Sequence, residues 1–268
     1  MPLPAPLSAA NRRVKDARRL SRRSERSERR LFLADGPKAV EGALQVEGCL
    51  VEVFAAPEAH LAHPGLLAAC ESVGVPWTPV EQRGIEALSD AVSPAGVIGV
   101  CRLLDVPAQE VLRPGRDLVA ICADVRDPGN AGTVVRCADA AGVDGVVLAG
   151  SSVDLHNPKT VRASVGSVFH LPVALEPDPL AAVRAAQAAG LTVLAADGAG
   201  EVDLFEADEI LARPTAWLFG NEAWGLPEEL AAAADHRVAI PIHGRAESLN
   251  LATAAALCLY ASARAQRA

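Results

Sequence analysis

Aromatic residues are scarce in this 268-residue chain, at 3% of the sequence, and lysine occurs only at positions 15, 38 and 159. Half of the residues are hydrophobic, so the core has to be built from Ala, Val and Leu. Charged residues make up 22% of the chain, close to the ordinary globular value, which argues against disorder. We interpret the preference for Arg over Lys as a composition bias. The length suits one large or two modest globular domains.

None of the six cysteines belongs to a CxxC pair, and most lie in apolar runs, where a thiol behaves as a small hydrophobic group. We therefore expect neither a disulfide framework nor a metal site. Apolar runs of membrane-spanning length are also lacking, so we expect no membrane segment. Residues 11–30 are charged, unlike a secretory signal. These absences predict a reducing, cytoplasmic compartment.

Basic residues gather near the amino terminus, although the net charge of the chain is −8. Residues 11–30 carry ten Arg or Lys and three acidic residues, a net charge of +7, which leaves −15 for the rest of the chain. A basic arm on an acidic body is typical of proteins that bind a polyanion. A solvated, partly helical tail without a ligand explains the same pattern equally well. Charge alone leaves both interpretations open.

Turn-forming residues and short apolar runs divide the chain into four parts. We expect a basic arm over 1–30 with its first ten residues disordered, a small α/β domain over 31–104, a linker over 105–116 and a larger α/β domain over 117–268. The small domain has expected strands at 31–34, 50–55 and 97–102 and helices at 37–46, 64–73 and 81–91. The larger has expected strands at 117–123, 145–149, 171–175, 191–196, 216–219 and 238–241 and helices at 180–189 and 248–264. This alternation predicts a parallel sheet covered by helices on both faces.

The segment Asp124–Gly142 begins where a predicted strand ends, at the sheet edge where α/β proteins bind ligands. Its residues 127–130 are turn formers, and a helix is expected to begin near Ala131. A capped helix start explains this turn, but it does not explain so many Gly and Asn residues around Arg136. The segment is neither a GxGxxG fingerprint nor a P-loop.

Two later segments also follow predicted strands. In the first, Gly220 would let a ligand approach the backbone and Glu222 offers a hydrogen-bond acceptor, although a structural turn explains both. In the second, Ser248 is suited to cap the closing helix. Asn250 then lies inside that helix, where Asn is unfavourable. We interpret His243 as a loop residue outside the site.

Together and in this order, the three segments resemble the motifs of the SpoU (TrmH-like) family of RNA ribose methyltransferases in the SPOUT superfamily. The motifs are DPGNAGTVVRCADAAG, FGNEAWGLPEEL and IPIHGRAESLNLATAAALCLY, and the likeness spans about residues 117–262. Residues 31–102 resemble the substrate-binding domain that many members carry. Ala223-Trp224 departs from the family pattern, where small or basic residues are usual, and the loop His243–Ala246 is also its own variant.

The resemblance implies a trefoil knot at the carboxyl end of the catalytic domain, a homodimer with its active site near the interface, and S-adenosylmethionine as cofactor. Arg136 matches the arginine proposed to activate the nucleophile, and the other motif polar residues are Asn130, Glu222, Ser248 and Asn250. Backbone groups of three loops would hold the cofactor, at Ala195, Ala196, Asp197, Leu218, Phe219, Gly220, Asn221, Ile240, Ile242, Ser248 and Leu249. RNA contacts are expected from the arm and one later residue, at Arg12, Arg13, Arg18, Arg19, Arg22, Arg23 and Arg162.

The activity implied by the resemblance is methylation of a ribose 2′-hydroxyl in structured RNA. Guanidinium groups do not normally deprotonate, so we hypothesise that Arg136 either has a perturbed pKa or orients a phosphate that assists. The extra N-terminal domain favours ribosomal over transfer RNA. A catalytically silent RNA-binding protein remains an alternative, and a Rossmann oxidoreductase is a distant one because the dinucleotide fingerprint is missing.

Overall fold

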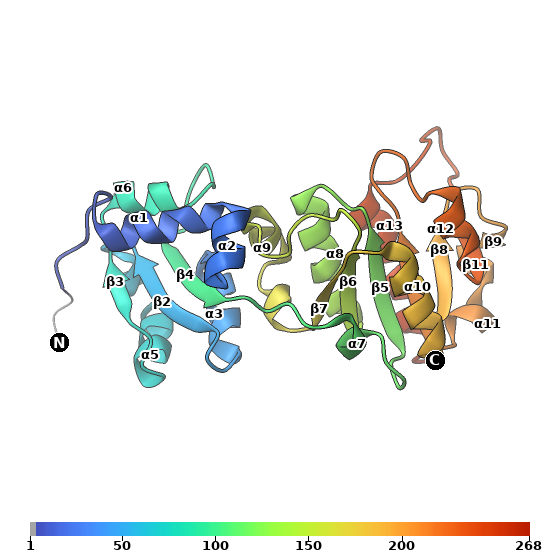
Figure 1. The fold of residues 1–268 in the computed structure, drawn as a ribbon, viewed down its shortest axis with the longest axis horizontal. Helices are drawn as coiled ribbons and strands as arrows, with labels where there is room; N and C mark the ends of the chain where they lie inside the picture. The colour runs from blue at the N-terminus through green and yellow to red at the C-terminus, as the bar shows by residue number, and fades with distance from the viewer. Residues whose placement is uncertain (1–3) are drawn as a thin grey trace. The chain divides into compact units, whose positions relative to one another are not determined.

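The computed structural model describes residues 4–268, which divide into two compact units. The first unit comprises the chain up to Leu104 together with His156–His170, and the second comprises Asp105–Leu155 and Leu171–Ala268. Both units are drawn in Figure 1. The first unit therefore includes a segment that the sequence analysis assigned to the domain over 117–268.

A four-stranded mixed sheet forms the centre of the first unit, in the order β1-β4-β2-β3. Its strands are β1 (Leu31–Asp35), β2 (Leu50–Ala55), β3 (Trp77–Pro79) and β4 (Val97–Arg102). Strand β4 runs antiparallel to both neighbours, whereas β2 and β3 are parallel. The helices of this unit are α1 (Arg12–Arg18), α2 (Arg23–Arg29), α3 (Pro37–Gln45), α4 (Ala59–Ala62), α5 (Pro64–Ser72), α6 (Gln82–Leu88) and α9 (Pro158–Ser164), with 3₁₀ turns η1 (Arg19–Ser21) and η2 (Ser167–Phe169).

The basic arm is folded onto this unit through a narrow apolar stripe that the sequence analysis overlooked. Val14, Ala17 and Leu20 are spaced three residues apart, and all three are buried in one core cluster. The expected disorder is wrong for residues 4–10, because Leu7 forms backbone hydrogen bonds with Pro79 and Glu81 beside β3. Residues 1–3 lie outside the described part of the chain.

The segment His156–His170 packs on the first unit through aromatic and small residues. The Phe169 ring lies 6.1 Å from the Phe32 ring, centroid to centroid, and His156 lies 4.8 Å from Phe32. Gly42 faces Phe169 so closely that a Cβ there would meet the ring at 2.8 Å. The segment joins this unit because strand β1 offers its apolar residues a core to pack against.

The second unit is built on a seven-stranded sheet in which every strand pair is parallel, in the order β7-β6-β5-β10-β8-β11-β9. The strands are β5 (Leu118–Ala123), β6 (Gly145–Ala149), β7 (Val173–Glu176), β8 (Thr192–Ala196), β9 (Val202–Asp203), β10 (Thr215–Phe219) and β11 (His236–Ala239). The helices are α7 (Ala108–Val111), α8 (Pro128–Ala141), α10 (Pro179–Ala188), α11 (Asp208–Leu211), α12 (Glu228–Ala232) and α13 (Leu251–Ala265), with a 3₁₀ turn η3 (Leu204–Glu206). The parallel sheet with helices is confirmed, whereas the knot stays a prediction.

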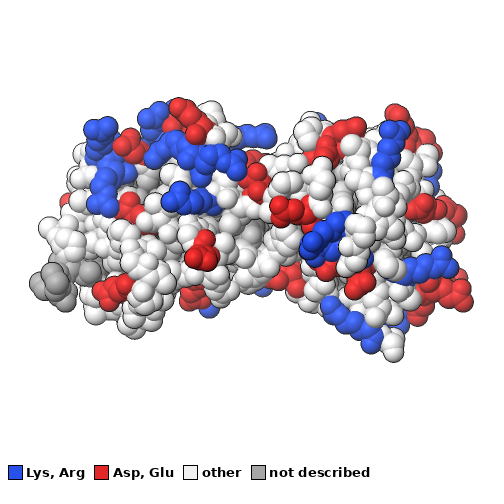
Figure 2. Space-filling view, turned by 60° about the horizontal axis from the view of Figure 1, so that its bottom comes forward, with Lys and Arg blue, Asp and Glu red and all other residues white. Residues whose placement is uncertain are grey.

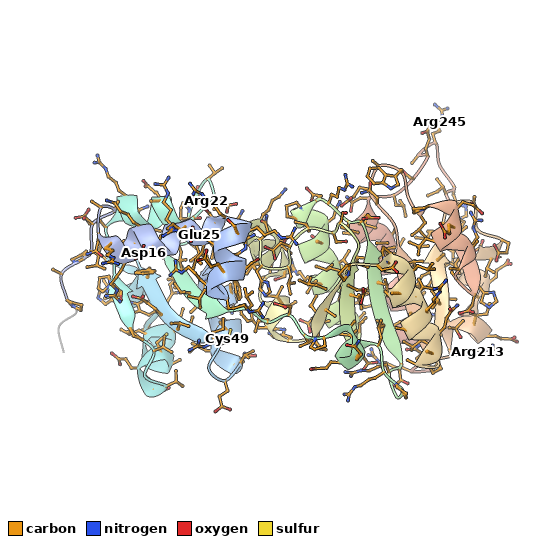
Figure 3. The ribbon with its side chains drawn as sticks, viewed as in Figure 1. Asp16, Arg22, Glu25, Cys49, Arg213 and Arg245 are labelled. Carbon is orange, nitrogen blue, oxygen red and sulfur yellow. The ribbon has the colours of Figure 1, made fainter. Side chains whose placement is uncertain are left out.

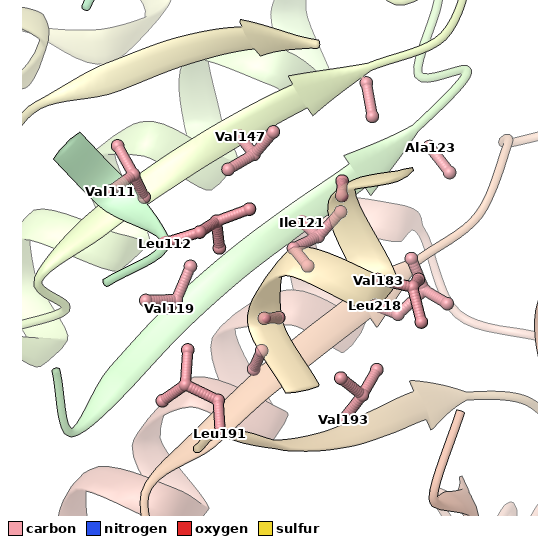
Figure 4. Close-up of a cluster of buried hydrophobic side chains, with 14 of the residues drawn as sticks. Val111, Leu112, Val119, Ile121, Ala123, Val147, Val183, Leu191, Val193 and Leu218 are labelled. Carbon is pink, nitrogen blue, oxygen red and sulfur yellow. The ribbon is translucent and has the colours of Figure 1, made fainter. Parts of the chain in front are cut away.

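Helices cover both faces of this sheet, as its continuously buried strands require. Figure 4 shows the core on the α10 face, where Val183 packs near Ile121 and Leu218. The segment 105–116, expected to be a linker, contains α7 and contributes buried Val111 and Leu112 to this core. Helices α8 and α13 pack against each other on the other face, as seen behind the sheet in Figure 1. No helix within residues 4–268 is long and apolar enough to cross a membrane.

The α13 face depends on a buried polar contact. The indole nitrogen of Trp217 on β10 donates a hydrogen bond of 2.8 Å to the Ser262 hydroxyl on α13, and both side chains are fully buried. A buried N–H group without an acceptor costs roughly 1–3 kcal/mol. The contact therefore stabilises the position of α13 against the sheet.

Replacing Ser262 with Ala should lower the free energy of unfolding by about 1–3 kcal/mol, because the Trp217 N–H loses its acceptor. Urea unfolding followed by circular dichroism measures this change. The control is Thr253→Ala on the exposed face of α13, which should change stability by less than about 0.5 kcal/mol. Equal stability of the two variants would contradict the role of the contact.

Candidate active site

A cavity of about 290 Å³ lies at the carboxyl ends of β8, β10 and β11. The loops that follow these three strands form its walls, in agreement with the rule that parallel sheets bind ligands at this edge. Its lining residues are Ala196, Asp197, Gly198, Phe219, Gly220, Asn221, Glu222, Ala223, Gly225, Val238, Ile240, Ile242, Glu247, Ser248, Leu249, Leu251 and Ala254. The three loops singled out from the sequence thus surround one space.

Most residues expected to hold the cofactor line this cavity, but two do not. Ala195 and Leu218 are fully buried in the core on the α10 face. They precede the strand ends by one residue, so alternation along the strand turns their side chains away from the loops. Glu247, Leu251 and Ala254 line the cavity without having been singled out, because no motif signal separates them from ordinary helix and loop residues.

The loop after β10 is a tight hairpin with little freedom to move. Asn221 and Gly225 exchange two backbone hydrogen bonds of 2.9 Å. The Asn221 side-chain amide also donates to the Asp124 carbonyl at 2.6 Å. A Cβ on Gly220 would lie 2.3 Å from the Gly225 backbone, so only glycine fits there. The hairpin is therefore a fixed wall of the cavity.

Glu222 joins this hairpin to the start of α8. Its carboxylate accepts hydrogen bonds from the backbone amides of Asp127 at 3.0 Å and Arg126 at 3.2 Å, and from the Asn130 side chain at 3.2 Å. Burial raises the pKa of Glu222, but these hydrogen bonds outweigh it and the pKa is lowered overall. Glu222 is therefore ionised at neutral pH and poorly suited to accept a proton.

Asn130 extends the network to the third loop. Its side-chain oxygen accepts a hydrogen bond of 3.0 Å from the Asn250 amide. Asn250 also caps α13, because its side-chain oxygen accepts from the Ala252 amide at 2.9 Å. The expectation that Ser248 caps this helix, with Asn250 inside it, is wrong. Asn is favoured at a cap, so its presence there needs no further explanation.

Arg136 lies apart from these contacts. It stands on α8, which begins at Pro128 and not near Ala131, since proline fits the first turn of a helix. Arg136 is exposed and does not line the cavity, and its side chain has no hydrogen bond or ion pair with any of residues 4–268. The network thus gathers Asn130, Glu222 and Asn250 without it. Its positive charge is available to a ligand outside the chain.

Asp197 lines the cavity and forms an ion pair with Arg237. The Arg237 guanidinium donates to the same Asp197 oxygen at 3.0 and 2.6 Å, and to Glu228 at 2.9 Å. Burial raises the pKa of Asp197, but hydrogen bonds from Ala199 and Arg237 lower it below its ordinary value overall. The loop beyond the cavity carries Arg245, which Figure 3 shows at its outer tip.

The predicted RNA-binding arginines fall into two groups in the first unit. Arg13 pairs with Glu52, and Arg19 pairs with Glu25 at 2.6 Å. Arg162 pairs with Asp35 at 3.4 Å and with Asp90, and its charge is thereby balanced by two carboxylates. Among residues 11–23, the exposed cations without an ion pair to residues 4–268 are Lys15, Arg18, Arg22 and Arg23. Arg12 is 95% exposed and lies 3.7 Å from Asp16.

These cations contribute to a positive surface on the first unit. Figure 2 shows Lys and Arg side chains concentrated on one part of this unit, with only a few acidic side chains between them. Arg22, labelled in Figure 3, projects from the turn between η1 and α2.

Among residues 4–268, no three His, Cys, Asp or Glu side chains gather as metal ligands would. The first unit thus has a cationic surface, whereas the cavity of the second unit is lined by uncharged and acidic residues.

Comparison with known proteins matches two family models to this chain. Residues 117–260 match the model of the SpoU rRNA methylase family, and residues 11–99 match that of the MRM3-like substrate-binding domain. The 23S rRNA guanosine 2′-O-methyltransferase RlmP of Bacillus subtilis is 33% identical to this chain over 256 residues, covering 94% of this chain and 96% of the relative.

Two solved structures share the fold along nearly the whole chain. The AdoMet-bound rRNA methyltransferase from Sinorhizobium meliloti has a TM-score of 0.82 and 36% identity, covering 96% of both chains. The SpoU methyltransferase AviRb from Streptomyces viridochromogenes, in complex with AdoMet, has a TM-score of 0.81 and 30% identity, covering 96% of this chain and 99% of that one. With its second and third motifs lining one cavity and more than half of its length matched, the chain belongs to the SpoU rRNA methylase family.

Proposed function

We propose that this protein transfers a methyl group from S-adenosylmethionine to a ribose 2′-hydroxyl of ribosomal RNA. The observation that carries the proposal is the cavity at the sheet edge, beside which Glu222, Asn130 and Asn250 connect the hairpin after β10 and the start of α8 to the start of α13. A relative whose name specifies 2′-O-methylation of 23S rRNA spans 94% of the chain. Ribosomal RNA is therefore favoured over transfer RNA.

The cavity fits S-adenosylmethionine in size and lining. Its volume of about 290 Å³ is near the lower end of the range for small-molecule sites. Ile240, Ile242 and Leu249 give it an apolar wall suited to adenine. The close packing of Gly220 keeps backbone groups at the surface of the cavity, where they can bond the ligand's polar atoms.

The bound cofactor supplies an activated methyl group on a sulfonium. Methyl transfer to the 2′-oxygen would break the sulfur–carbon bond and release S-adenosylhomocysteine, and the hydroxyl proton would pass to the neighbouring phosphate or to water. The chain's task is to hold the hydroxyl in line with that bond. The hydrogen bond between Glu222 and Asn130 fixes the hairpin after β10 against α8. Asn250 attaches the start of α13 to the same group.

We propose that Arg136 assists the nucleophile, which is the ribose 2′-hydroxyl. Its exposed, unpaired guanidinium is free to bind the phosphate beside the target ribose, and Glu222 is not a competing base because its pKa is lowered. We favour orientation of that phosphate as its role, because guanidinium groups in general do not act as bases in proteins. Ser248 belongs to the cavity wall and serves the cofactor.

In this proposal the first unit binds the RNA. Lys15, Arg18, Arg22 and Arg23 supply positive charge that no acidic side chain of residues 4–268 neutralises by an ion pair. Such groups bind phosphates and release counterions. Arg13, Arg19 and Arg162 serve mainly the fold, because each is already paired. The six free cysteines agree with a reducing compartment such as the cytoplasm.

A homodimer is the assembly we propose. On α13, Leu257 and Tyr260 are 38% and 52% exposed on one face, three residues apart. The same helix begins at the cavity, where Leu251 lines the wall, and it packs on α8, which carries Arg136. An interface on this face would lie close to the active site, as the family resemblance implies.

Replacing Arg136 with Ala should lower the rate of methyl transfer by about 10²- to 10³-fold, because the reacting hydroxyl loses its electrostatic partner. Labelled S-adenosylmethionine with ribosomal RNA measures the rate, and mapping of 2′-O-methyl groups identifies the product. Cofactor affinity should not change. The control is Arg184→Ala, an exposed arginine on the opposite face of the sheet. A rate in Arg136→Ala equal to the control removes Arg136 from the mechanism. Absence of transfer by the wild type would refute the function and leave a silent RNA-binding protein.

Replacing Arg22 and Arg23 with Gln should reduce the salt dependence of RNA binding. The slope of log affinity against log salt concentration should fall by about 1.4, at roughly 0.7 per phosphate contact with single strands. Filter binding at several salt concentrations measures this slope. Arg19→Gln serves as the control because Arg19 is paired with Glu25. The assignment of free cations is wrong if both variants reduce the slope equally per charge removed.

Replacing Leu257 with Glu should convert the dimer into monomers and lower methyl transfer, because a buried carboxylate would oppose the apolar interface. Sedimentation velocity measures the mass. Leu61→Glu is the matched control, since Leu61 is 72% exposed on the first unit. A wild type that sediments as a monomer, or a Leu257→Glu protein that remains dimeric, would exclude this interface.

A further inference from the structure

Trp224 is exposed at the rim of the cavity. Its side chain is 54% accessible, whereas Trp77 is 9% exposed and Trp217 is fully buried. The neighbours of Trp224 in the chain, Ala223 and Gly225, both line the cavity. A large aromatic side chain left in solvent at this position forgoes the stabilisation of burial, and the packing of the fold does not account for it.

The backbone holds Trp224 in a fixed place. It lies in the hairpin closed by Asn221 and Gly225, and the Ala223 amide donates to the Asn221 side chain at 2.8 Å. Asn221 is in turn anchored to the Asp124 carbonyl, at the end of β5. The ring is therefore carried by a hydrogen-bonded turn.

A cation lies against the Trp224 ring. The central guanidinium carbon of Arg126 is 5.0 Å from the ring centroid, within the range of a cation–π contact. The backbone amide of Arg126 donates to Glu222, so the contact joins the rim to the network that organises the site. Arg126 itself is exposed. Arg126 and Trp224 form an ordered pair whose surface still faces solvent.

We propose that Trp224 is a stacking platform for a nucleobase within one nucleotide of the ribose that is methylated. The inference rests on the proposed function and deepens it. Single-stranded bases stack on exposed aromatic side chains, and a neighbouring arginine adds charge attraction to the phosphate chain. Every base has a π-face, so stacking positions the ribose without reading the base. Trp224 is a positioning residue, because it acts on the reacting hydroxyl through the base.

Tryptophan fluorescence tests the contact without any methyl transfer. Trp224 is the one exposed tryptophan of the three in the chain, all of which are described. Adding ribosomal RNA to the full-length protein should quench the exposed component of the emission, and Trp224→Phe should abolish this quenching. Emission that stays unchanged at saturating RNA overturns the proposal.

Steady-state kinetics test what the contact does. Trp224→Ala and Trp224→Leu should raise KM for RNA about tenfold, and Trp224→Phe should stay within about threefold of the wild type, because only an aromatic face restores stacking. The kcat and the dissociation constant of S-adenosylmethionine should change little. The matched control is Phe205→Ala, an aromatic residue 60% exposed elsewhere on the second unit.

The outcomes separate this inference from the function beneath it. The stacking proposal is overturned if Trp224→Ala and Phe205→Ala have equal KM values for RNA. It is also overturned if Trp224→Leu has a KM as low as that of Trp224→Phe. In both cases the methyltransferase proposal stands. Weakened cofactor binding in Trp224→Phe would assign the ring a structural role and also overturn the proposal. A wild type without methyl transfer refutes the proposed function, whereas the fluorescence titration still decides whether Trp224 meets RNA.

Discussion

The active site depends on one carboxylate. Glu222 accepts hydrogen bonds from two backbone amides and the Asn130 side chain, and Asn130 in turn accepts from Asn250. Groups more than ninety residues apart in the chain are thereby held at one sheet edge. Because the Glu222 oxygens accept these hydrogen bonds and its pKa is lowered, Glu222 is poorly suited to accept a proton.

Charge is divided between the two units according to their tasks. Acidic groups at the cavity are balanced by local donors, as with Asp197 and Arg237. On the first unit, some arginines form ion pairs with acidic side chains and others form none. This division separates arginines that stabilise the fold from those available to phosphates, a distinction that net charge alone does not make.

Much of the architecture follows from local patterns. Strands β2, β4 and β6 begin and end where apolar runs predict them, because a buried strand needs a continuous apolar stretch. The helical arm was less visible, since Val14, Ala17 and Leu20 form a stripe only one residue wide. The segment 156–170 gave no sign of joining the first unit, because its partner Phe32 lies far away in the sequence.

Sequence patterns alone predicted the fold class and singled out the polar residues of the segments that follow the strands. Only the folded chain decided that Asn250 caps α13, that Arg162 is neutralised by Asp35 and Asp90, and that Arg136 stands outside the cavity. The physical reason is the separation in sequence between the interacting groups. Periodicity and turn chemistry act between residues a few positions apart, whereas caps, ion pairs and cavities arise from groups that tertiary packing brings together.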